Sequence, residues 1–368
     1  MTANVRIEAL QGKRIFITGG AGFIGSRLTR ALTAQGADVT IYDNLLEQVH
    51  GSSPRLDLPA RLVVGDVRDK ATMKAAVEAS NPEVVVHLAA ETGTGQSADE
   101  PTRYTEVNVV GTAQLIEILR DQAAPPERFV LAATRAVYGE GAYRTNSGQI
   151  VVPAPRDLEA MHEGRFAVYG ADRTPLEPVP TDIDVPPMPG SVYGSSKLMQ
   201  EYLLAQTPAP WQSVILRLQN VYGPGQSLRN PYTGVLSIFA NQAMRGQPIF
   251  VYEDGEIYRD FVFVDDVVAA FVAGCHEPAL LGGTFNIGTG EPTAILTAAR
   301  LIMRELGLDE QNVSVNGAFR PGDIRYAVAD IHRTLRTGVW KPEVAPASGI
   351  AQLVAWARSE FERGLVEN

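Results

Sequence analysis

The chain has 368 residues, of which 45% are hydrophobic, and it carries a formal net charge of −10 at pH 7. A chain of this length is too long to fold around one small hydrophobic core. We therefore expect two lobes or one large α/β domain with an elaborated end. The acidic balance argues against a nucleic-acid partner, because phosphates demand a basic surface, but a few local arginines can still bind a small anionic substrate.

The cysteine, histidine and apolar content excludes several classes of protein. The single Cys275 excludes an internal disulfide and a Cys-rich zinc site, and the five histidines show no paired ligand spacing, so we predict no metal site. The chain has no run of about 18 apolar residues, and its first 13 residues lack an apolar signal core. We therefore expect a cytoplasmic protein without membrane association.

A glycine-rich segment joins a short β-branched and aromatic run at 14–18 to a helical pattern. Gly19 permits a tight turn, Gly22 lets the backbone approach a pyrophosphate, and Gly25 lets the helix pack closely on the strand. The spacing is Gly-x-x-Gly-x-x-Gly, in the strand, turn and helix context that dinucleotide binding requires. The competing interpretation is a plain strand-to-helix turn.

A second β-rich run at 38–42 ends in Asp43, which lies 18 residues after Gly25, about where an acidic residue meets an adenosine ribose. A carboxylate at this position repels a 2′-phosphate, so we predict NAD rather than NADP as the cofactor. Alternatively, Asp43 only forms a turn at the end of the strand.

Alternation of β-rich and helical patterns predicts the fold. The β-rich runs cover 14–18, 38–42, 61–64, 83–88 and 128–132, and the runs at 214–218 and 284–287 extend the series. This pattern is typical of the α/β class with a Rossmann-type, doubly wound parallel sheet, in which ligands bind at the carboxyl ends of the strands.

After about residue 220 the alternation gives way to loop-rich and helical segments. We expect an NAD-binding domain over 12–220, with 262–290 returning to it, and a smaller C-terminal substrate lobe over 221–261 and 291–368. The segment 140–190 departs from both, because it carries eight prolines between 151 and 190 without sustained periodicity. It predicts a long irregular loop, and its position directly before Tyr193 favours a flap near the active site over an inert surface insertion.

The segment 192–204 has the pattern of a helix, in which positions i and i+4 share a face, so Tyr193 and Lys197 point the same way. A phenol is a poor base at neutral pH, but an adjacent ammonium and a positive nicotinamide ring both favour phenolate. Thr134, at the end of the run 129–134, could hydrogen-bond the substrate oxygen that loses its proton. The competing interpretations are a solvated lysine on an amphipathic helix and a threonine that closes a strand.

These features together resemble the extended short-chain dehydrogenases that act on nucleotide sugars, over nearly the whole chain. The matching motifs are Thr18–Gly25, Asp43-Asn44, Gly65–Val67, His87–Ala90, Asn108–Thr112, Val137–Gly139, Tyr193–Lys197, Asn220–Gly225, Arg259–Val262 and Arg320–Asp323. The resemblance implies that Thr134 takes the place of the catalytic Ser/Thr, that Tyr193 is the acid/base, and that Lys197 holds the nicotinamide ribose and tunes Tyr193.

The resemblance also implies two sets of binding residues. The residues implied for NAD are Gly19, Gly22, Phe23, Ile24, Gly25, Asp43, Asn44, Asp66, Val67, Leu88, Ala89, Ala90, Asn108, Tyr193 and Lys197. The residues implied for a nucleotide-diphosphate sugar are Glu91, Thr92, Thr134, Asn220, Arg259, Arg320 and Asp323. The segments 221–261 and 291–368 are accordingly expected to form a nucleotide-sugar-binding lobe.

Two positions narrow the reaction within the family. Its 4,6-dehydratases carry an Asp-Glu pair directly after the threonine, whereas this chain has Arg135 and Ala136, so dehydration is not expected. A decarboxylase would need a glutamate near the site, and none is evident. The remaining reaction is inversion of carbon 4 of a dTDP- or UDP-hexose through a transient 4-keto sugar. The segments 87–97 and 219–235 and the insertion look most like bacterial dTDP-L-rhamnose 4-epimerases, although this insertion lacks the cysteines of those relatives.

Two alternatives stay open at this point. A net NDP-sugar 4-ketoreductase, or another NDP-sugar oxidoreductase, would exchange its cofactor in every turnover. A non-catalytic dinucleotide sensor would share the fold, but retention of Thr134, Tyr193 and Lys197 weighs against it. The resemblance also predicts a homodimer through residues 99–120 and the Tyr193 helix, whose apolar stripes could instead belong to the core.

Overall fold

The computed structural model of the protein describes residues 9–52, 56–228, 234–320 and 322–363. Residues 229–233 and Pro321, which belong to two of the segments quoted above, lie outside the described residues. None of the helices in these four stretches is both long and apolar enough to cross a membrane.

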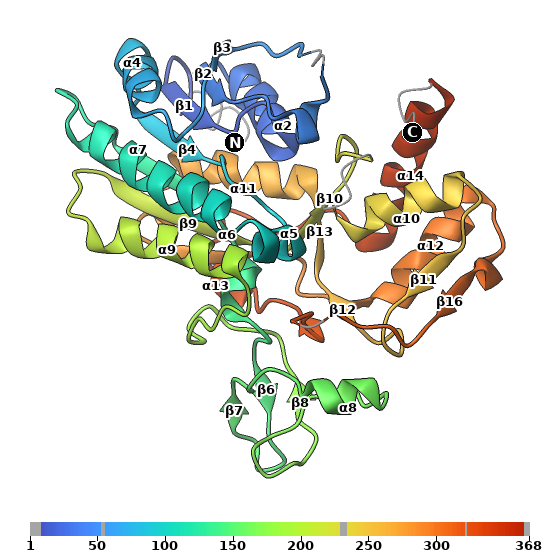
Figure 1. Ribbon diagram of the computed structural model, residues 1–368. Coiled ribbons are helices and arrows are strands. Elements are labelled where there is room, and N and C mark those ends of the chain that lie inside the picture. The colour runs from blue at the N-terminus through green and yellow to red at the C-terminus, as the bar shows by residue number, and fades with distance from the viewer. Residues whose placement is uncertain (1–8, 53–55, 229–233, 321, 364–368) are drawn as a thin grey trace.

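A seven-stranded sheet, parallel throughout, forms the centre of the molecule (Figure 1). Its strands in spatial order are β3 (Arg61–Val64), β2 (Asp38–Asp43), β1 (Arg14–Thr18), β4 (Val84–His87), β5 (Arg128–Thr134), β9 (Gln212–Leu218) and β14 (Thr284–Ile287). The predicted doubly wound α/β fold is confirmed. The strand order reverses between β1 and β4, and such a switch point opens a crevice at the carboxyl ends of the strands.

Helices cover both faces of this sheet, because successive residues of each strand point to opposite sides. Phe16 and Val85 belong to the core shared with one layer of helices, whereas Ile15 and Ile17 belong to the core shared with the other. The first layer contains α4 (Lys70–Ser80), α7 (Gly111–Arg120) and α9 (Val192–Gln206), and the second contains α2 (Phe23–Ala34) and α11 (Val264–His276).

Three helices and several short strands build a second lobe over the carboxyl ends of the strands (Figure 1). Its helices are α10 (Val235–Met244), α12 (Ile295–Leu306) and α14 (Pro346–Glu362). Its strands pair as β10 (Asn220–Tyr222) with β13 (Phe261–Phe263), β11 (Ile249–Val251) with β16 (Val313–Val315), and β12 (Tyr258–Arg259) with both β15 (Thr293–Ala294) and β17 (Tyr326–Ala327). The remaining short elements are α3 (Glu47–His50), α5 (Thr94–Asp99), α6 (Pro101–Tyr104), η1 (Thr105–Val110), η2 (Arg135–Tyr138), η3 (Pro278–Leu280), η4 (Glu310–Asn312) and α13 (His332–Arg336).

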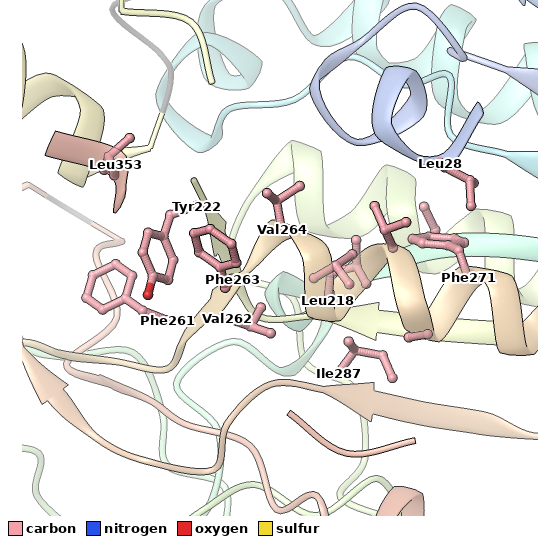
Figure 2. Close-up of a cluster of buried hydrophobic side chains, with 14 of the residues drawn as sticks. Leu28, Leu218, Tyr222, Phe261, Val262, Phe263, Val264, Phe271, Ile287 and Leu353 are labelled. Atoms are coloured by element: carbon pink, nitrogen blue, oxygen red, sulfur yellow. The ribbon is translucent and has the colours of Figure 1, made fainter. Parts of the chain in front are cut away.

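One hydrophobic cluster runs from the sheet into the second lobe (Figure 2). The ring of Tyr222 packs edge-on against Phe261 and Phe263, with ring centres 5.9 and 5.6 Å apart, and Leu353 of α14 lies on the lobe side of the same cluster. Truncating one such buried ring costs on the order of 3–5 kcal/mol. This shared core fixes the position of the second lobe against the sheet.

The insertion 140–190 projects from the main body as a separate unit (Figure 1). It contains a three-stranded antiparallel sheet, ordered β7 (Ile150–Val151), β6 (Tyr143–Arg144) and β8 (Glu177–Pro178), and a short helix α8 (Leu158–His162). The prediction of a long irregular loop missed these short elements, although most of the segment lies outside any helix or strand. Strands of two residues produce no periodicity in the sequence, so the pattern could not reveal them.

Candidate functional site

A cavity of about 590 Å³ opens at the carboxyl ends of β1, β4, β5 and β9. Most of the residues expected to bind a cofactor or substrate line it. They are Gly19, Gly22, Phe23, Ile24, Gly25, Asp43, Asn44, Val67, Leu88, Ala89, Ala90, Glu91, Thr92, Thr134, Tyr193, Lys197 and Asn220. Five others lie outside this lining, namely Asp66, Asn108, Arg259, Arg320 and Asp323.

The glycine loop between β1 and α2, together with the first turn of α2, has no room for a side chain at Gly19, Gly20 and Gly25; a Cβ at Gly20 would lie 2.7 Å from Cγ2 of Ile41. Gly19 has φ +71°, and a Cβ there would lie 2.7 Å from the backbone nitrogen of Ala89. A Cβ at Gly25 would lie 2.2 Å from the carbonyl oxygen of Gly19. At Gly22, by contrast, a Cβ would meet only that same oxygen, at 3.4 Å. The protein itself therefore leaves space beside Gly22, which is where the motif requires close approach of a pyrophosphate.

Asp43 ties this loop to the end of β2. Its Oδ2 accepts a hydrogen bond from the Ala21 N–H at 3.0 Å, and its Oδ1 accepts one from the Leu45 N–H at 2.9 Å. The helix α2 begins at Phe23 without a side-chain cap, so its first N–H groups face the cavity beside this carboxylate. The loop thus fits the pyrophosphate and ribose of a dinucleotide.

Asp66 is occupied by protein partners. Arg68 donates to both of its carboxylate oxygens at 2.9 Å, and Asn44 donates to Oδ2 at 3.0 Å. The hydrogen bonds from Arg68 hold the pKa of Asp66 far below its usual value. Its neighbour Val67 lines the cavity, and the predicted adenine contact of Asp66 and Val67 stays a prediction.

Asn108 lies on a π-helical turn, η1, and is fully buried. Its amide nitrogen donates to the Glu91 carbonyl at 3.0 Å and to the Ser196 hydroxyl at 2.9 Å, and its Oδ1 accepts from the Glu91 N–H at 2.8 Å. These bonds link the loop after β4 to helix α9. Asn108 therefore supports the wall of the cavity from behind.

Thr134, Tyr193 and Lys197 meet in the cavity, although 59 positions separate the first two in the chain. Thr134 ends β5, its hydroxyl accepts from the Ala136 N–H at 3.2 Å, and the same hydroxyl favours a lower pKa of the Tyr193 phenol. Tyr193 stands in the first turn of α9, which is capped by Ser191 accepting from the Gly194 N–H at 3.0 Å. The helix end and the strand end thus converge on one point.

Burial is the main influence on the pKa values of Tyr193 and Lys197. Burial raises the pKa of Tyr193, and the hydrogen bond from Thr134 and the charge of Arg135 oppose that shift. Burial lowers the pKa of Lys197 to about 7, against the attraction of Glu201 one helical turn further on. The tuning of Tyr193 by Lys197 is not among these effects and stays a prediction.

The residues expected to bind the nucleotide diphosphate are distributed over β10, β12 and the loop before β17. Asn220 lines the cavity, and its buried Oδ1 has no hydrogen-bond partner among the described residues. Arg259 donates to the Ile324 carbonyl at 2.7 Å; burial lowers its pKa, and the carboxylate of Asp323 opposes this more than that of Glu140 or Glu253. Arg320 is exposed and stacks on Tyr252, with its guanidinium carbon 4.9 Å from the ring centre.

Arg156, from the insertion, forms buried ion pairs and a hydrogen bond with the segments that carry Glu253 and Asp323. It pairs with Glu253 through two bonds of 2.8 and 2.9 Å and with Glu140 at 3.2 Å, and it donates to the Asp323 carbonyl at 2.6 Å. Its side chain is only 4% exposed and that of Glu253 is fully buried. The insertion is thus tied to the loop that carries Asp323, although nothing in these contacts tests whether it moves as a flap.

Sequence reasoning missed several residues that line the cavity, among them His50, Arg135, Gln219 and Gln226. Arg135 and Gln219 each directly follow a strand end, at Thr134 and Leu218. The rule that ligands bind at the carboxyl ends of parallel strands could have identified both. His50 and Gln226 carried no comparable signal, because His50 ends the four-residue helix α3 and Gln226 lies in an irregular segment, so neither directly follows a strand of the sheet.

The chain matches the model of the NAD dependent epimerase/dehydratase family over residues 15–156 and 165–288. It is 42% identical to a dTDP-L-rhamnose 4-epimerase of Burkholderia thailandensis, over 98% of this chain and 99% of that one. It is 34% identical to a UDP-glucose 4-epimerase of Mycolicibacterium smegmatis, over 95% of this chain and 100% of that one.

Solved structures give the same result. The crystal structure of a UDP-glucose 4-epimerase from Thermotoga maritima with UDP-glucose superposes with a TM-score of 0.75 at 28% identity, covering 94% of this chain and 99% of that one. MoeE5 in complex with UDP-glucuronic acid and NAD superposes with a TM-score of 0.75 at 26% identity, covering 95% and 100%. With its glycine loop, its Thr134, Tyr193 and Lys197 group and these full-length matches, this chain belongs to the NAD dependent epimerase/dehydratase family.

Proposed function

We propose that the protein is an NAD-dependent nucleotide-sugar 4-epimerase, which inverts carbon 4 of a dTDP- or UDP-hexose through a transient 4-keto intermediate. The observation that carries this proposal is the convergence of Thr134, Tyr193 and Lys197 with the glycine loop on one cavity. Within an epimerase/dehydratase family, Arg135 and Ala136 next to Thr134 favour epimerisation, because dehydration needs a carboxylic acid and a carboxylate there. The relatives named as 4-epimerases support the same choice.

The residues would divide the work as follows. The glycine loop, Asp43 and Lys197 would hold NAD, which when bound accepts the carbon-4 hydride and returns it. Tyr193 would take the proton of the carbon-4 hydroxyl while Thr134 hydrogen-bonds the same oxygen, and Tyr193 would return the proton after inversion. Burial works against the phenolate, so the positive charges around Tyr193 must favour it.

Inversion requires the 4-keto sugar to present its other face. The sugar can turn about its phosphate linkage only if the nucleotide stays fixed, and Asn220, Arg259 and Asp323 are proposed to fix it. The guanidinium of Arg259 would pair with phosphate oxygens and the carboxylate of Asp323 would accept from a ribose hydroxyl. In this proposal the second lobe is the nucleotide-sugar-binding lobe, and the sheet with 262–290 is the NAD-binding domain.

NMR of the purified enzyme without added cofactor tests the proposal. Separate samples receive dTDP-L-rhamnose, UDP-glucose, UDP-galactose and UDP-glucuronate, and we expect one of them to approach a mixture of two epimers. This result would also identify the sugar. Samples that stay unchanged until stoichiometric NAD(H) or NADP(H) is supplied would instead indicate a net oxidoreductase. Dinucleotide binding without any turnover would indicate a sensor.

We further propose a homodimer through helices α7 and α9, which lie side by side on one face of the sheet (Figure 1). Val110, Met199 and Tyr202 on this face are 42–44% exposed, which leaves apolar surface available for a second copy. Sedimentation velocity should then give the mass of two chains. A single-chain mass at micromolar concentration would contradict this proposal. The cytoplasmic location expected from the sequence likewise stays a prediction.

A further inference from the structure

Arg135 is a charged group in the cavity that the reaction described above does not use. It follows Thr134 at the end of β5 and lines the cavity together with Tyr193. Its Nη1 is buried and has no hydrogen-bond partner among the described residues. A guanidinium is always a donor and never an acceptor, so a buried and unpaired Nη1 requires an acceptor from outside the protein.

The charges around Arg135 indicate what that acceptor is. Burial and the nearby positive charge of Arg259 lower the pKa of Arg135 to about 9, and Asp323 and Glu140 only partly oppose this. Both carboxylates have other roles, since Glu140 pairs with Arg156 at 3.2 Å and Asp323 also acts on Arg259. The positive charges of Arg135 and Arg259 thus act against one another, and a phosphate or carboxylate beside the unpaired Nη1 of Arg135 would relieve that repulsion.

Two further unpaired groups lie in the same cavity. The buried Oε1 of Gln219 and the buried Oδ1 of Asn220 have no partners among the described residues, and both residues line the cavity with Arg135. These amide oxygens accept hydrogen bonds and so suit hydroxyl groups rather than phosphates. The cavity thus presents a donor for an anion beside acceptors for sugar hydroxyls.

We propose that Arg135 binds the diphosphate of the substrate at the phosphate next to the sugar, completing a clamp with Arg259. This proposal rests on the proposed function, because the diphosphate is the anion that dTDP- and UDP-hexoses share. Arg135 lines the cavity together with the Tyr193 phenol and is influenced by the charge of Arg259, and the phosphate next to the sugar connects the rest of the nucleotide to the sugar that reacts. A contact at this phosphate also survives rotation of the sugar, whereas a contact with a sugar hydroxyl would have to break.

The test is calorimetric titration of the NAD-loaded enzyme with dTDP and UDP alone and with the nucleotide sugar that the NMR experiment identifies. Arg135→Gln should weaken binding of the preferred free nucleoside diphosphate by about 10- to 100-fold, as expected for loss of one charged hydrogen bond. The same variant should weaken binding of the nucleotide sugar by the same factor. Arg135→Lys, which keeps the charge but not the forked donors, should recover part of the affinity. The control Arg333→Gln removes a surface arginine paired with Asp184 and should leave both affinities unchanged.

Three outcomes would overturn the assignment. Unchanged affinity for free dTDP and UDP with weakened nucleotide sugar would place Arg135 against the sugar, for example on a carboxylate at carbon 6. Unchanged affinity for all ligands would show that Arg135 contacts neither the diphosphate nor the sugar. A Lys variant no better than the Gln variant would show that its charge is not used.

The binding experiment also separates this proposal from the proposed reaction. If the Arg135→Gln variant loses affinity for nucleoside diphosphates and the wild type epimerises no sugar, binding of the diphosphate by Arg135 is supported and the proposed reaction is rejected. If the wild type epimerises a nucleotide sugar and the variant binds nucleoside diphosphates with unchanged affinity, the proposed reaction is supported and the role of Arg135 is rejected. The variant should also unfold no earlier than the wild type in urea, because it removes a buried charge, so misfolding is recognised independently.

Discussion

Replacement of Lys197 by methionine should abolish turnover and at the same time stabilise the protein at acidic pH. The side chain of Lys197 is 3% exposed, and burial lowers its pKa from 10.5 to about 7. The buried ammonium also lies near His87, whose own pKa is lowered to about 3 by burial and by Lys197. The protein thus maintains a buried cation at a cost in folding free energy.

The size and sign of this cost follow from the two pKa values. Below about pH 7 both the folded and the unfolded chain carry the proton, and the whole cost is present. Between pH 7 and 10.5 only the unfolded chain binds the proton, so the cost of Lys197 fades and the stability of the wild type rises with pH. At about 1.4 kcal/mol for each pKa unit, the variant should gain about 5 kcal/mol at pH 6 and about 1.4 kcal/mol at pH 9.5.

Urea unfolding followed by circular dichroism at pH 6 and pH 9.5 would measure this difference. Both proteins must first be freed of dinucleotide, because a ligand that binds only the folded state adds its own stability. As a control, Lys74→Met replaces an exposed lysine paired with Glu78 on helix α4 and should change stability by less than about 0.5 kcal/mol at either pH. Equal gains for Lys197→Met at the two pH values, or a loss at pH 6, would refute the reasoning.

Three other variants test separate parts of the structure. Tyr193→Phe should lower kcat by about 10²- to 10⁴-fold, since it removes the proposed acid/base, while nucleotide affinity stays unchanged; full activity in the NMR assay would reject that role. Gly25→Ala places a Cβ 2.2 Å from the Gly19 carbonyl oxygen and should give protein that no longer retains NAD through purification, as measured by absorbance of the extracted nucleotide; normal retention would contradict it. Arg156→Met leaves Glu253 and Glu140 short of a partner and should cost on the order of 3 kcal/mol in urea unfolding. It should also raise KM more than it lowers kcat, and an unchanged KM would show that the insertion does not position the substrate loop.

Much of the fold was predictable because its signals are local. All seven strands of the sheet lie where β-rich runs alternate with helical patterns, from Arg14–Thr18 to Thr284–Ile287. The glycine loop was equally clear, since a turn without room for a Cβ restricts the residue type at Gly19 and Gly25. A strand buried on both faces, or a turn with positive φ, imposes its requirement on neighbouring residues in the chain, so the sequence records it directly.

The candidate site depended partly on resemblance, because its members are far apart in the chain. Motif spacing on one helix indicated that Tyr193 and Lys197 share a face, but their meeting with Thr134 follows from the pairing of β5 and β9 and the packing of α9. The exposed stacking of Arg320 on Tyr252, 68 residues away, gave no sequence signal.

The amino-acid sequence by itself determined the sheet, the dinucleotide loop and the two motifs of the reaction. Only the tertiary structure decided that the insertion forms a small sheet, that Arg156 pairs with Glu253 across 97 positions, and that the Nη1 of Arg135 is buried without a partner. The physical reason is that periodicity reports which face of one element is buried. The partner of a buried charge depends instead on which distant segments the fold brings within about 3 Å of it.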